Sequence, residues 1–129
     1  MTLQEELLDM SELRPYVKMR DEYFANAEKF AGKGEYRKAS ELLWGAVTQA
    51  IKALASKHGL VIENHAQFFD FMQTTAKETE DESLYKTFLF LNDLHKNFYD
   101  EKIRPVDFGI YLEEAYRFML KLNEIMEKL

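Results

Sequence analysis

The chain has 129 residues, a formal net charge of −6 at pH 7 and no cysteine. This length suits one domain, residues 1–129, and can bury a core without disulfide or metal support, which becomes usual only below about 40 residues. The lack of cysteine excludes disulfides, thiolate metal sites and cysteine nucleophiles. Because the sequence is 47% hydrophobic with only two prolines and five glycines, we expect long helices joined by few loops.

The sequence predicts a cytoplasmic protein without a membrane span or a signal peptide. No run approaches the roughly 18 uninterrupted apolar residues of a membrane helix. The first ten residues are acidic and amphipathic, unlike a signal peptide. The negative net charge argues against DNA as a partner. Residues 29–58, however, hold six basic and two acidic side chains, which predicts a locally positive surface or simply a solvated face.

The first predicted helix covers residues 14–31. Pro15 would lie in its first turn, where the missing N–H costs nothing. Residues 1–13 are predicted to form a short N-terminal arm or a separate helix. Gly32 or Gly34 is expected to end the first helix in a left-handed conformation.

The second predicted helix covers residues 35–58. Its inner residues are small, and Gly45 would let a neighbouring backbone come close. Asn64 followed by Gln67 resembles a capping box, so a third helix should begin there. The acidic run at 78–82 should end that helix.

The fourth predicted helix covers residues 82–100, and the last begins near Phe108. The fourth has a buried stripe spaced by four and three residues: Leu84, Phe88, Leu91, His95 and Phe98. The last helix keeps the same spacing as far as Leu129, a seam typical of helices packed about 20° apart. The fold predicted is therefore an all-α, antiparallel bundle of four or five helices.

Three blocks of the sequence resemble the HEPN-like helical family, and most closely its archaeal PaREP-type branch. They are residues 27–47 continued by 50–55, the helix that begins near His65, and residues 94–100 ahead of the last helix. The resemblance covers about residues 20–128. It implies a helical bundle, often dimeric, in proteins linked to nucleotide or RNA recognition. Several relatives are ribonucleases of toxin–antitoxin or defence systems.

The ribonucleases of that family share an Arg followed, after four to six residues, by a His. This chain has only three histidines, His58, His65 and His95, and none has an Arg at that distance ahead of it. The resemblance therefore implies a non-catalytic binding module. A ribonuclease that uses His95 is the alternative.

His95 is the one candidate catalytic residue, because a histidine on an apolar seam can serve as a general base. The alternative is a core histidine bonded to a carbonyl or a tyrosine. Asn97, Tyr99 and Arg104 gather where the fourth helix ends, and could hold a phosphate or the edge of a base. They could equally satisfy the last carbonyls of the helix.

Trp44 and Lys52 are eight residues apart, close to two helical turns, and should share a face. They could stack a base and hold a phosphate. The alternative is a partly buried tryptophan beside a lysine whose stem lies along the apolar surface. No metal site is predicted, because no Glu-x-x-His pair occurs, and no phosphate loop or dinucleotide motif indicates a cofactor.

The leading hypothesis from the sequence is a module that binds a nucleotide, an RNA or a protein partner as a homodimer. Phe71 and Phe90 lie outside the main stripes of their helices, which suggests a second buried face or a core wrapped on several sides. A purely structural adaptor is the remaining alternative.

Overall fold

The computed structural model describes the backbone of residues 3–100 and 103–129, and the side chains of residues 13–97 and 103–129. Every regular element in these residues is helical, which confirms the predicted all-α fold. The elements are α1 (Leu3–Gly32), α2 (Tyr36–Lys57), α3 (His65–Glu78), α4 (Glu82–Leu91), α5 (Asp93–Asp100), the 3-10 turn η1 (Pro105–Asp107) and α6 (Phe108–Glu127). None of the described helices combines the length and the apolar character needed to cross a membrane.

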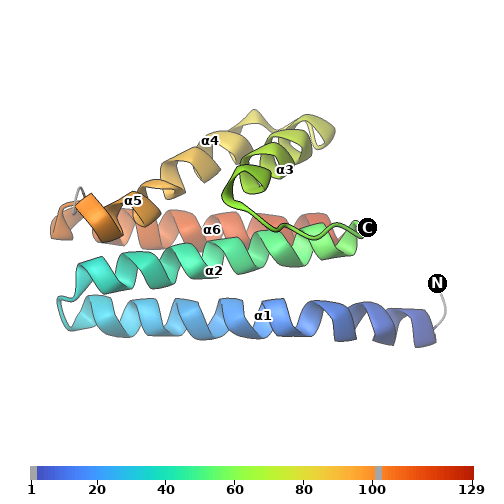
Figure 1. The fold of residues 1–129 in the computed structure, drawn as a ribbon, viewed down its shortest axis with the longest axis horizontal. Coiled ribbons are helices and arrows are strands. Elements are labelled where there is room, and N and C mark those ends of the chain that lie inside the picture. Colours follow the sequence, from blue (N-terminus) through green and yellow to red (C-terminus); the bar gives the residue numbers. More distant parts are fainter. Residues whose placement is uncertain (1–2, 101–102) are drawn as a thin grey trace.

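Helix α2 is the centre of the bundle. It pairs antiparallel with α1, and α6 runs beside it in the same direction (Figure 1). Helix α5 also packs on α2, while α3 and α4 form the upper part of the molecule in Figure 1. Half of the α2 residues are buried, and many of them are alanines, which let four neighbouring helices approach closely.

Helix α1 is continuous through Pro15, unlike the predicted helix at 14–31 with a separate segment before it. A proline inside a helix lacks one hydrogen bond and crowds the preceding turn, at a cost of about 3 kcal/mol. The residues ahead of Pro15 include many Leu and Glu, which are strong helix formers and favour continuation of the helix.

The ends of the helices follow the predicted turn chemistry. Gly34 has φ of 79°, so it, rather than Gly32, is the left-handed residue after α1. Helix α3 begins with the predicted capping box, in which the side chains of Asn64 and Gln67 each accept a hydrogen bond from the other's backbone N–H. Helix α3 ends at Glu78, within the acidic run.

The predicted fourth helix is divided at Asn92 into α4 and α5. Leu84, Phe88 and Leu91 are buried as predicted, but among the described side chains beyond Asn92 the buried positions of α5 are Leu94 and Asn97. The side chain of Phe98, the last residue of the predicted stripe, lies outside the described residues. The division therefore shifts the buried stripe by one residue. His95 leaves the predicted seam and becomes about one-third exposed.

We expect Gly45→Ala to lower the free energy of unfolding by about 1–2 kcal/mol. Inside a helix, alanine is otherwise more favourable than glycine by about 1 kcal/mol. A Cβ at position 45 would lie 2.9 Å from Cδ2 of the Tyr23 ring, so a side chain of α1, and not its backbone, needs this space. Urea unfolding measures the effect. Gly32→Ala is the matched control, because no atom lies within 4 Å of its added Cβ; equal effects of the two changes would contradict the packing argument.

Candidate functional site

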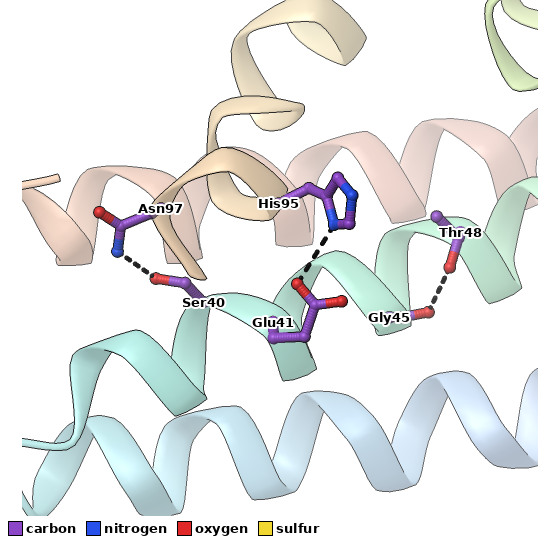
Figure 2. A network of polar contacts seen from close by, with 6 residues as sticks. All are labelled: Ser40, Glu41, Gly45, Thr48, His95 and Asn97. Carbon is purple, nitrogen blue, oxygen red and sulfur yellow. Dashed lines mark hydrogen bonds and ion pairs between the residues drawn. The ribbon is translucent and has the colours of Figure 1, made fainter. Parts of the chain in front are cut away.

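His95 faces a carboxylate of the central helix. Its Nδ1 atom lies 3.3 Å from Oε2 of Glu41, which α2 presents from the opposite side (Figure 2). The two side chains are 33% and 39% exposed. A carboxylate on one nitrogen of an imidazole orients the ring and favours one tautomer, with the proton on that nitrogen. The other ring nitrogen, Nε2, then carries the lone pair.

Trp44 supports the His95 ring from within the core. The two rings are stacked, with centroids 6.0 Å apart and planes inclined by 30°. Trp44 also contacts Phe88 of α4, and only 4% of it is exposed. It therefore holds the imidazole in place and presents no ring face of its own to a ligand.

His65 brings a second imidazole to the same place. It is the first residue of α3, and its ring centroid lies 5.4 Å from that of His95 and 6.2 Å from that of Trp44. We call Glu41, Trp44, His65 and His95 the histidine cluster. His65 is exposed overall, but Phe69 packs edge-on against its ring at 5.2 Å. Partial desolvation, and next the positive charge that His95 can carry, lower the pKa of His65 below 6.5.

Lys52 lies on the same side of α2 as Trp44, as the eight-residue spacing predicts. Trp44 contacts His65, and the ammonium of Lys52 lies 6.0 Å from the ring centroid of Phe68, one turn further along α3. The first turn of α3 therefore lies between the histidine cluster and this cation.

Asn97 has a different environment from His95, as expected for residues two apart on a helix. Its amide nitrogen donates to Oγ of Ser40 at 2.9 Å, and its amide oxygen accepts from the backbone N–H of Ile103 at 2.6 Å. Figure 2 shows the two side chains pointing apart. Asn97 is 2% exposed. Its polar atoms are thus used to join α2, α5 and the segment before η1.

The remaining candidates do not join the cluster among the described residues. Arg104 is exposed and pairs with Asp107 at 2.8 Å across η1. Tyr99 lies in α5, but its side chain is outside the described residues. Within the part of the chain whose side chains are described, no three His, Asp or Glu side chains are placed to hold a metal ion.

Sequence reasoning missed Glu41 and His65 as members of the site. Glu41 is 54 residues from His95, so no local motif links the two. For His65 a signal existed, because the Asn64 capping box predicts that it opens a helix, where side chains are usually accessible. Its position beside His95 depends on how α3 packs on α2.

We expect Asn97→Ala to lower the free energy of unfolding by about 1–3 kcal/mol, because the N–H of buried Ile103 loses its acceptor. Urea unfolding monitored by circular dichroism measures this. Asn26→Ala, at an exposed position of α1, is the control and should change stability by less than about 0.5 kcal/mol. Equal stabilities of the two variants would show that the Asn97 amide does not support the fold.

We expect the His65 ring to titrate below pH 6.5 and its midpoint to rise in His95→Gln, because that change removes one of the two causes of the lowered pKa. NMR of the imidazole ring protons between about pH 4.5 and 8.5 gives the midpoint. The signals of His58, which contacts Phe71 instead, should be the same in both proteins. A midpoint that stays or falls in the variant would contradict the interaction.

The lowered pKa of His65 also determines how the free energy of unfolding changes with pH. The folded state binds a proton at His65 less tightly than the unfolded chain does. The contribution of His65 to stability is therefore complete above about pH 6.5 and decreases as the pH falls through the folded-state pKa.

The comparisons with known proteins identify a family. No curated protein matches the chain in sequence. The model of the archaeal PaREP1/PaREP8 family matches residues 15–119, which include all the members of the histidine cluster and most of the helical core. The chain therefore belongs to the archaeal PaREP1/PaREP8 family.

Proposed function

We propose that the protein is a cytoplasmic module that binds nucleotides or single-stranded RNA at the histidine cluster. One observation carries this proposal: the imidazoles of His65 and His95 lie 5.4 Å apart at the surface, above the buried Trp44. Two accessible aromatic rings held by a rigid support are suited to stacking and hydrogen bonding with a base.

The neighbouring charges fit the two parts of a nucleotide. The Glu41 carboxylate can accept hydrogen bonds from the amino group of a base, but would repel a phosphate. Lys52, on the far side of the first turn of α3, can pair with a phosphate. This separation of charges favours a ligand whose base lies over the imidazoles and whose phosphate points toward Lys52.

A ribonuclease is the second candidate, and a specific observation favours it. Phosphodiester cleavage needs one group to remove a proton and another to donate one. The cluster contains two imidazoles in unlike environments: Glu41 orients His95, while burial lowers the pKa of His65. Neighbouring titratable groups in unlike environments are a common basis for acid and base roles. The pair would act without the Arg-to-His motif of the HEPN-like ribonucleases that the sequence resembles.

Binding can be measured through Trp44, the only tryptophan of the chain. We expect the four nucleoside monophosphates, or a short single-stranded RNA, to change its fluorescence and to raise the unfolding temperature. Ligand at about 100 times its dissociation constant adds roughly 2.7 kcal/mol of stability, several degrees for a domain of this size. His65→Ala should weaken binding about tenfold or more, since it removes the more exposed ring.

The control for binding is His58→Ala, which removes an exposed imidazole outside the cluster. It should leave the affinity unchanged. If no probe binds the wild-type protein, or if His58→Ala weakens binding as much as His65→Ala does, the proposed site is wrong. A structural adaptor would then be the better interpretation.

Incubation of the same RNA with purified protein separates binding from cleavage. Cleavage that is lost in His95→Ala and kept in His58→Ala would establish the second candidate. Binding without cleavage would establish a non-catalytic module. Cleavage that persists unchanged in His95→Ala would come from a contaminant.

A further inference from the structure

A cavity lies between α3 and the loop that joins α2 to α3 (Figure 1). Its volume is about 330 Å³, which is within the range of small-molecule sites, about 300–1,000 Å³. Residues 60–62 of the loop form one wall, and one face of α3 forms the other. That face carries Gln67, Asp70, Phe71, Thr74 and Glu78. His65 of the histidine cluster lies on the opposite face of α3, so the cavity is a separate site.

Phe71 gives this cavity an aromatic surface. Phe71 and Phe90 are the two large apolar residues that lie outside the main stripes of their helices in the sequence. Phe90 stacks on Tyr111, with ring centroids 4.2 Å apart, so it packs within the chain. Phe71 is only partly buried: its ring contacts that of His58 and lines the cavity.

The loop wall of the cavity is held by hydrogen bonds at both of its ends. The backbone N–H of Leu60 donates to the carbonyl of Ala55 at 2.9 Å, and the backbone N–H of Glu63 donates to Oε1 of Gln67 on α3. Between these bonds, Leu60 and Val61 are 53% and 71% exposed. Because the wall is already ordered, a ligand does not have to fix it in place on binding.

The charge of the cavity is negative. Asp70 and Glu78 are among the described lining residues, and none of these is a lysine or an arginine. Both carboxylates are exposed, and neither forms an ion pair with another described residue. They are eight residues apart in α3 and therefore lie on one face, about 12 Å apart along the helix axis, with Phe71 and Thr74 between them.

We propose that this cavity binds an aliphatic polyamine. Two of its ammonium groups pair with Asp70 and Glu78, and the methylene chain between them lies against Leu60, Val61 and Phe71. A ligand with one ammonium group reaches only one of the two carboxylates, and an anion is repelled by both. This inference does not depend on the ligand proposed for the histidine cluster.

An NMR titration with spermidine tests the proposal. We expect the backbone amide signals of Leu60, Val61 and Phe71 to shift until they saturate. The ring signals of His58 should shift with them, whereas those of His65 should not. Spermidine should bind more tightly than putrescine, which is too short to reach both carboxylates, and more tightly than n-butylamine, which has a single ammonium group.

Two charge variants test the carboxylates. Asp70→Asn and Glu78→Gln should each raise the dissociation constant of spermidine about fivefold, the upper range for an exposed ion pair, and together about 25-fold. Glu28→Gln is the matched control, because it removes one negative charge from an exposed position of α1. It should leave the dissociation constant unchanged, although the whole chain is acidic, with a net charge of −6.

An apolar pair of variants tests the loop wall. Val61→Ser should weaken the binding of spermidine, whereas Val106→Ser, at a valine of η1 that is 78% exposed, should not. Circular dichroism melting of each variant confirms that the fold is kept. The proposal is overturned if spermidine does not bind, if n-butylamine binds as tightly as spermidine, or if Glu28→Gln weakens binding as much as Asp70→Asn does.

Discussion

The structure depends on the burial of one helix, α2, by four others. Its alanines bring α1, α5 and α6 close, while its larger residues (Leu43, Val47, Ile51 and Leu54) fill the spaces between them and are fully buried. A polar side chain that is buried on such a helix must find its hydrogen-bond partners inside the protein, and in α2 this applies to Ser40. Ser40 does so by donating to the carbonyl of Tyr36 at 2.7 Å and accepting from Asn97.

The contact between Ser40 and Asn97 connects the core to the site. It fixes α5 against α2 at one position, and His95, two residues earlier on α5, then faces Glu41, the residue after Ser40 (Figure 2). The buried hydrogen bond between Asn97 and Ser40 thus determines how α5 is aligned with α2, and so places His95 opposite Glu41 at the surface. The turn at Asn92 also contributes, because beyond it Leu94 and Asn97 are buried and His95 is not.

Elements that depend on local pattern could be predicted from the sequence. Helix α2 agrees with its predicted bounds to within one residue at each end, and the capping box at Asn64 is present. The turn at Asn92 could not be predicted from the sequence. The φ and ψ of this residue, −62° and −20°, are close to helical values, so the break requires no residue with unusual backbone preferences. Extending the apolar spacing across it placed His95 in the core.

The site was harder to predict than the fold because it combines α2, α3 and α5. Trp44, Lys52 and His95 were proposed from residue type and helical spacing, yet the role of Trp44 as a buried support depends on Phe88 and His95 packing on it. Asn97 is of a residue type that often binds ligands, but it is buried, as residues that only support the fold usually are. Only the packing of α5 distinguishes these two possibilities.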